Sequence, residues 1–124
     1  MKVSEKEFDR RVKKAIRRIP EEIRQHLDNI LVSVQRSASR EMLEDLDMDP
    51  DEPLLGVYRG VPLTERSVLS PPEFSDTIIL FQEPLEEMCD TMEELEEEIE
   101  ITVVHEIAHA VGIGEGRLAE LGYD

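Results

Sequence analysis

Two histidines four residues apart, with a glutamate directly after the first, most constrain the fold of this chain. The motif His105-Glu106-Ile107-Ala108-His109 follows a long stretch in which apolar residues recur at helical spacing. We therefore expect one helix that includes the motif and ends at Gly112, because glycine readily takes the left-handed conformation that closes helices. The apolar stripe of this helix consists of Met88, Met92, Leu95, Ile99 and Val103, and a run of glutamates between residues 93 and 98 covers the other side.

The spacing of the two histidines favours a metal site. Residues four apart lie one turn apart on the same helix face, and two imidazoles there can bind one zinc ion at distances of about 2.0–2.1 Å. Glu106 lies one step round the helix, where its carboxylate can take a proton from zinc-bound water. Zinc lowers the pKa of that water towards about 7. The motif thus predicts His105 and His109 as ligands and Glu106 as the general base.

A third ligand is expected from the residues after the helix. The motif continues as HExxHxxGxxE, and a turn at Gly112 can bring Glu115 back to the ion. Two histidines and one carboxylate leave a fourth position for water, as in catalytic zinc sites. Glu120, on an expected short helix at residues 117–121, is the alternative ligand. We favour Glu115 on loop reach. One zinc ion per chain is the expected cofactor, although these ligand types also suit other divalent metals.

The composition narrows the class of protein. The 124 residues suit a single domain over residues 1–124. Cys89 is the only cysteine, which excludes an intrachain disulfide and argues against a thiolate zinc site. The sequence has no apolar run of about 18 residues and no apolar signal core near its first residue. We therefore expect a cytoplasmic protein that does not act on membranes.

Charge is distributed unevenly along the chain, whose net charge is -16. Residues 1–40 contain 11 Lys and Arg against 6 Asp and Glu, whereas residues 41–124 contain 3 against 24. An acidic chain repels nucleic acid, so nucleic acid is not an expected partner. The basic segment over residues 10–18 is expected to be the solvated face of a helix, or a docking surface for an acidic partner such as the acidic helix of this chain.

Local signals predict the other helices and strands. Ser4 and Glu7 form a capping-box pattern at the start of a helix that ends near Pro20. The strand before the motif helix has the strongest strand signal, and Pro84 is expected to end it. The further expected elements are a short helix over residues 21–28, strands over residues 30–34, 54–60 and 77–81, a helical turn over residues 41–46 and a possible return strand from residue 61 to 63.

Three further features bear on catalysis. The strand at residues 77–81 is either an ordinary buried strand or a rim on which an extended substrate adds as another strand. Tyr58 and Tyr123 could each donate a hydrogen bond to a developing oxyanion. For each tyrosine, a place in the core or on the surface is the more common alternative.

The segment HEIAHAVGIGEGRLAELGYD, residues 105–124, resembles the C-terminus of small bacterial zincin-like metallopeptidases. Their motif is close to that of the metzincins, has an acidic residue at the position of Glu115, and is followed by a tail that matches residues 118–122. The resemblance covers about residues 5–124. It implies an α+β zincin-like fold, in which a small mixed sheet packs on helices and a long active-site helix lies near the C-terminus. Ala110 departs from the family, which often has a further histidine there.

The expected function is that of a zinc-dependent metallopeptidase that hydrolyses peptide bonds by Glu-assisted attack of zinc-bound water. Only 15 residues follow His109, so we expect an open, shallow site or one that a partner chain covers. A peptide or an unfolded protein segment is the expected substrate, and the acidic surface favours a basic one. The alternative is a metal-binding accessory protein or a protein-interaction module with zincin geometry and little or no catalysis.

Overall fold

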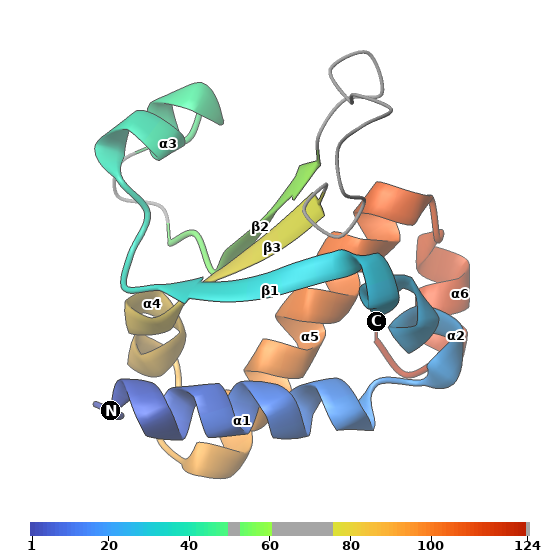
Figure 1. Ribbon diagram of the computed structural model, residues 1–124, viewed down its shortest axis with the longest axis horizontal. Coiled ribbons are helices and arrows are strands. Elements are labelled where there is room, and N and C mark those ends of the chain that lie inside the picture. The colour runs from blue at the N-terminus through green and yellow to red at the C-terminus, as the bar shows by residue number, and fades with distance from the viewer. Residues whose placement is uncertain (50–52, 61–75, 124) are drawn as a thin grey trace.

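The chain has an α+β order, in which three helices come before the first strand and three follow the last strand of the described residues (Figure 1). The computed structural model describes residues 1–49, 53–60 and 76–123. Among the helices of these residues, none is both long enough and apolar enough to cross a bilayer. The elements are α1 (Glu5–Arg18), α2 (Glu21–Arg24), the 3-10 helix η1 (Gln25–Asn29), β1 (Ile30–Gln35), α3 (Arg40–Asp45), β2 (Gly56–Gly60), β3 (Asp76–Phe81), α4 (Gln82–Glu87), α5 (Met92–Val111) and α6 (Glu115–Glu120).

The long helix α5 carries the histidine motif in its last two turns. At its start, Thr91 is the N-cap, and its Oγ1 accepts a hydrogen bond from the Glu94 N–H at 3.1 Å. At its end, Gly112 has a φ of 79°, the left-handed conformation that glycine tolerates, and its N–H donates to the Ala108 carbonyl. The predicted helix is confirmed, but Met88 is not part of it: Met88 follows α4 and is 50% exposed.

Helix α4 begins directly after β3 and was not predicted. Pro84, expected only to end the strand, lies in the first turn of α4, where its missing N–H leaves no helical hydrogen bond unmade. Buried Gln82 donates from Nε2 to Glu86 Oε1 at 2.7 Å, and the Val3 N–H donates to the same oxygen at 3.1 Å. The turn after the proline therefore anchors the residues that precede α1.

The three strands form one small mixed sheet in the order β1-β3-β2. β1 runs parallel to β3 and β2 runs antiparallel to it, so Val32 and Tyr58 lie opposite Ile78 on its two sides. The predicted strand at residues 77–81 is confirmed as β3. It does not form a rim for substrate, because it is the central strand of this sheet. In the described part of the chain, the outer strands are β1 and β2. The possible return strand from residue 61 lies outside the described residues.

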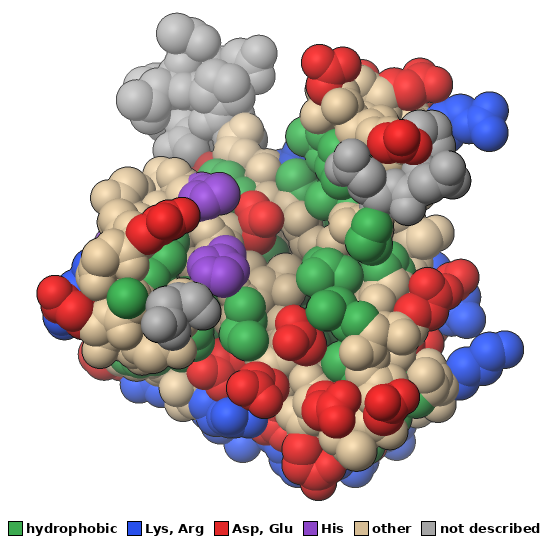
Figure 2. All heavy atoms as spheres, turned by 180° about the vertical axis from the view of Figure 1, so that it is seen from behind, with side chains coloured by type: hydrophobic (Ala, Val, Ile, Leu, Met, Phe, Trp, Pro, Cys, Tyr) green, Lys and Arg blue, Asp and Glu red, His purple; other side chains and the backbone are tan. Residues whose placement is uncertain are grey.

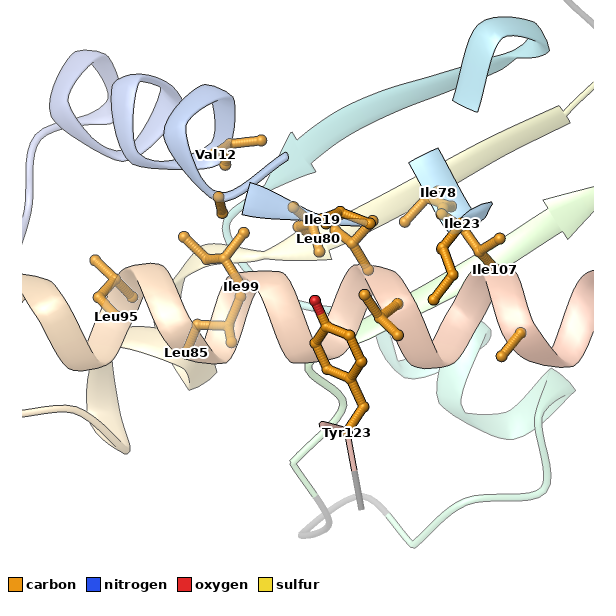
Figure 3. Close-up of a cluster of buried hydrophobic side chains, with 14 of the residues drawn as sticks. Val12, Ile19, Ile23, Ile78, Leu80, Leu85, Leu95, Ile99, Ile107 and Tyr123 are labelled. Carbon is orange, nitrogen blue, oxygen red and sulfur yellow. The ribbon is translucent and has the colours of Figure 1, made fainter. Parts of the chain in front are cut away.

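Helices α1 and α5 pack on each other and on one face of the sheet (Figures 1 and 3). Ile99 and Ile107 of α5 point towards side chains of α1, α2 and β3 in Figure 3. Burying each such side chain contributes about 1.5–3 kcal/mol, so this layer fixes the position of α5. Its fully buried members include Phe8, Ile19, Ile23, Ile78, Leu80, Leu85, Leu95, Ile99, Val103, Val104 and Ile107.

Ion pairs join α1 to α5 at the border of this core. Arg11 Nη1 lies 3.2 Å from Glu96 Oε2, and Arg18 Nε lies 3.0 Å from Glu100 Oε1. The N-cap of α1 is as predicted, since Ser4 Oγ accepts from the Glu7 N–H at 3.1 Å. Part of the basic segment predicted from the sequence thus contacts the acidic helix of the same chain.

Candidate metal centre

His105 and His109 are exposed on the last two turns of α5, whereas Ile107 and Ala108 between them are buried. The buried pair faces the core and fixes the rotation of the helix, so the imidazoles lie on its outer side. Figure 2 shows two histidine side chains next to each other, with hydrophobic and acidic side chains around them. The structure therefore keeps the predicted pair of ligands on one accessible face.

Both histidines line an open pocket of about 580 Å³ between the end of α5 and α6. The connection from α5 to α6 is only three residues long, Gly112 to Gly114, so α6 folds back beside the histidines. Most of the remaining lining is apolar. The residues around the pocket are His105, His109, Ile113, Glu115, Gly116, Leu118, Ala119 and Tyr123.

Glu115 and Glu120, the two candidates for the third ligand, lie at opposite ends of α6. Glu115 is its first residue and lines the pocket together with the histidines. Glu120 is its last residue, and its carboxylate accepts a hydrogen bond from Arg117 Nη1 at 2.6 Å. The surroundings of the two side chains thus favour Glu115 as the residue with a carboxylate available to an ion.

Arg117 also fixes α6 to the body of the protein. Its Nε donates to Glu22 Oε2 at 2.8 Å, and its Nη2 donates to the other oxygen of the same carboxylate. The hydrogen bonds from Arg117 lower the pKa of Glu22 below its usual range. This two-point contact between α6 and α2 holds the helix that begins with Glu115.

The donor types at the pocket fit zinc, which binds imidazole nitrogen and carboxylate oxygen. His105, His109 and Glu115 make no hydrogen bond or ion pair with any residue that the structure describes, so none is committed to another role. Nevertheless, no three His, Cys, Asp or Glu side chains of the described residues come together as a group that could hold a metal ion. The predicted ligands surround one pocket without all three converging on one point.

Glu106 lies on the side of α5 that faces β2, and not among the residues that line the pocket. Its Oε2 accepts a hydrogen bond of 3.2 Å from the backbone N–H of Tyr58. Burial raises the pKa of Glu106, while the Tyr58 N–H and the two neighbouring histidines act in the opposite direction. A raised pKa makes this carboxylate a better proton acceptor than an exposed glutamate.

Tyr123 has a structural partner in this arrangement. Its hydroxyl donates to Glu100 Oε2 at 2.7 Å, and burial raises the pKa of that hydroxyl, so it remains a donor. No described donor makes a hydrogen bond to Glu100 Oε1, whose charge is balanced by the ion pair with Arg18. The Tyr123 ring lies beside α5 with its oxygen towards the helix (Figure 3). The contact anchors the end of the chain to α5, beside the pocket.

The close approach of β2 to α5 was not foreseen from the sequence. A Cβ atom on Gly56 would lie 2.7 Å from Cγ2 of Thr102, so a larger residue there would force the strand away from the helix. Glycine inside a strand often marks such an approach, and Gly56 was the available signal. Because Thr102 is one turn before Glu106, this contact places β2 next to Glu106.

Comparisons with known proteins agree with the family resemblance and the fold. Residues 27–123 match the family described as zincin-like metallopeptidase. A search of curated proteins found no significant match. The solved structure of a conserved hypothetical protein from Thermus thermophilus is similar, with a TM-score of 0.59 and 19% sequence identity over 92% of this chain and 99% of that chain. At this identity the likeness shows a shared fold.

Proposed function

The chain belongs to the zincin-like metallopeptidases, and on that premise we propose that it hydrolyses peptide bonds with the help of one zinc ion. The observation that carries the proposal is the placement of the motif: two uncommitted histidines line a pocket with Glu115, and Glu106 is held beside them at the edge of β2. A pair of surface histidines without a function would need neither a shared pocket nor a fixed glutamate between them.

We propose His105, His109 and Glu115 as the groups that would hold zinc. Their donor types suit that ion, and the pocket that they line is open to solvent. When bound, zinc supplies a Lewis acid that polarises the scissile carbonyl and lowers the pKa of water. Glu120 is the weaker candidate for the third ligand, because Arg117 already binds its carboxylate.

Glu106 is the proposed general base. Its carboxylate accepts a proton from the attacking water and then passes the proton to the amine of the leaving peptide. Partial burial favours the neutral form of this side chain, and so favours its taking up the proton. Ile113 and Leu118 give the neighbouring pocket an apolar surface that could receive a substrate side chain.

The proposed substrate is a peptide or an unfolded protein segment. An open pocket beside a short helix, α6, can admit a chain that has no fixed structure of its own. Acidic side chains are frequent on the face that carries the histidines (Figure 2), and the net charge of the chain is -16. Both features favour basic over acidic peptides.

The direct test is peptide-bond hydrolysis by the zinc-loaded protein, with an unfolded basic protein as substrate, for wild type and Glu106→Gln. We expect Glu106→Gln to keep its zinc and to lose turnover by about 10²–10⁴-fold, the usual contribution of a general base. Glu120→Gln is the matched control and should remain active. A Glu106→Gln protein as active as wild type would refute the role of the base.

A second candidate function is a metal-binding accessory protein or interaction module that has little or no catalysis. Within this alternative, the lack of a three-ligand group among the described residues favours the interaction module over the metal-binding accessory protein. The observation against it is Glu106, since metal binding alone does not require a base beside the histidines. Zinc-loaded wild-type protein that cleaves none of a broad set of unfolded substrates would favour this alternative.

A further inference from the structure

We propose that the backbone N–H of Tyr58 positions the carboxylate of Glu106, so that strand β2 sets the direction in which the general base points. The inference rests on the proposed function, because it assigns a role to a group that acts through Glu106. It is carried by one contact, the 3.2 Å hydrogen bond from the Tyr58 nitrogen to Glu106 Oε2, and by the way the fold builds that contact.

The Tyr58 N–H is directed away from the sheet. Residues of an antiparallel strand alternate between those that bond to the neighbouring strand and those whose N–H and C=O point outward. Leu55 belongs to the first kind, since its carbonyl accepts from the Phe81 N–H at 2.9 Å. Tyr58, three residues later, belongs to the second kind. Its N–H therefore adds nothing to the pairing of β2 with β3, and Glu106 satisfies it instead.

Gly56 brings this outward N–H within reach of the helix. A side chain at Gly56 would collide with Thr102, which shows how closely the strand lies on α5. Gly56 and Tyr58 are two residues apart on β2, and Thr102 and Glu106 are one turn apart on α5. Along this line of contact, Gly56 packs against Thr102, and Tyr58 donates a hydrogen bond to Glu106.

The contact fixes one carboxylate oxygen and leaves the other. Among the described residues, Tyr58 is the only one that donates a hydrogen bond to Glu106, and the bond is to Oε2. A hydrogen bond to an ionised acceptor is stronger than one between neutral groups. With Oε2 held, the side chain cannot rotate freely, and Oε1 is the oxygen available to receive a proton. Displacing a catalytic group by about 1 Å can lower a rate by about 100-fold.

Amide hydrogen exchange of the metal-free full chain tests the contact without any assay of activity. We expect the Tyr58 amide to exchange about tenfold faster in Glu106→Ala than in wild type, the factor that one hydrogen bond of typical net strength supplies. The amides of Val57 and Arg59, which point at β3, are the internal controls and should not change. Equal exchange of the Tyr58 amide in both proteins would overturn the proposal.

Two variants that differ at the N–H test the consequence for catalysis. Tyr58→Pro removes the N–H, and proline is tolerated where the N–H of an outer strand points outward. Tyr58→Ala keeps the N–H. Both variants lose the phenol ring of the tyrosine. We expect the two variants to bind zinc alike and to have similar KM, with kcat of Tyr58→Pro lower by about 10–100-fold. If Tyr58→Pro does not fold, an ester in place of the amide at residue 58 removes the same N–H and keeps the ring.

The outcomes separate this proposal from the proposed function. Equal kcat for Tyr58→Pro and Tyr58→Ala, in a chain whose peptidase activity requires Glu106, would overturn the positioning role alone. Absence of peptidase activity in wild type, together with faster exchange in Glu106→Ala, would overturn the proposed function and still support the contact. Faster exchange and a selective loss of kcat in Tyr58→Pro would support both.

Discussion

The two ends of helix α5 have different surroundings. Leu95, Ile99 and Val103, in its first half and middle, are fully buried, and ion pairs to α1 border them. In the last two turns, His105 and His109 are exposed and line an open pocket. Both parts of the helix bury one face in the core, and only the last two turns also present exposed histidines to a pocket.

This difference explains how a small protein can keep two exposed histidines in place. Exposed histidine side chains make few contacts that could hold their helix in place. The backbone of α5 does not depend on contacts of these side chains. The buried residues along the rest of α5 supply the rigidity, because close-packed side chains resist movement. Changes in the two halves should therefore have separable effects, on stability and on the site.

The largest expected effect on stability comes from the buried half. Ile99→Ala should lower the free energy of unfolding by about 2–5 kcal/mol, because it removes buried methyl groups and leaves a cavity. The zinc affinity of the molecules that remain folded should not change. Urea unfolding and zinc titration measure the two quantities, and Ile99→Val, with an expected loss of about 0.5–1.5 kcal/mol, is the graded control. A loss of zinc affinity with unchanged stability would contradict the separation.

A smaller effect is expected where β2 meets α5. Gly56→Ala places a Cβ 2.7 Å from Thr102 and should destabilise the protein by about 1–3 kcal/mol, since an overpacked contact forces backbone shifts. Gly114→Ala, next to the pocket, meets no atom within 4 Å and should change stability by no more than about 0.5 kcal/mol. Thermal unfolding compares the two variants. Equal destabilisation would show that β2 does not approach the helix as described.

The smallest effect concerns the exposed contact of α6 with Glu22. Because Arg117 lowers the pKa of Glu22 in the folded state, the pair stabilises the protein above the unfolded pKa of Glu22, and that contribution is lost as the pH falls through the folded pKa. Arg117→Ala should therefore lower Tm slightly at pH 7 and hardly at all in acid below the folded pKa. A difference in Tm that persists unchanged in acid would exclude this pair as its cause.

Local patterns in the sequence predicted much of the fold. The capping residue Ser4, the apolar spacing in α5 and the closing Gly112 each act within a few residues, so the sequence alone indicated both long helices. Pro84 did not indicate helix α4, because a proline is as compatible with the end of a strand as with the first turn of a helix. The central position of β3 could not be read from its apolar run, since strand order depends on which distant segments pair.

The candidate site was predictable to a similar extent. The histidine pair and Glu106 follow from their spacing on one helix. The contact between Glu106 and Tyr58 was not predictable, because it requires β2 to dock on α5, and Gly56 was its only local signal. From the sequence, only the reach of the loop favours Glu115 over Glu120. The structure adds a physical reason, because Glu115 lines the pocket and Glu120 binds Arg117. The third ligand itself remains a prediction.

Zinc binding measured by calorimetry tests the central claim most directly, on wild type and on His109→Ala, Glu115→Ala and Glu120→Ala. We expect one zinc ion per wild-type chain, loss of binding in His109→Ala, weaker binding in Glu115→Ala and unchanged binding in Glu120→Ala. Circular dichroism of each metal-free variant should match wild type, since these side chains are exposed. A wild-type chain that binds no zinc, or equal binding by wild type and His109→Ala, would contradict the account.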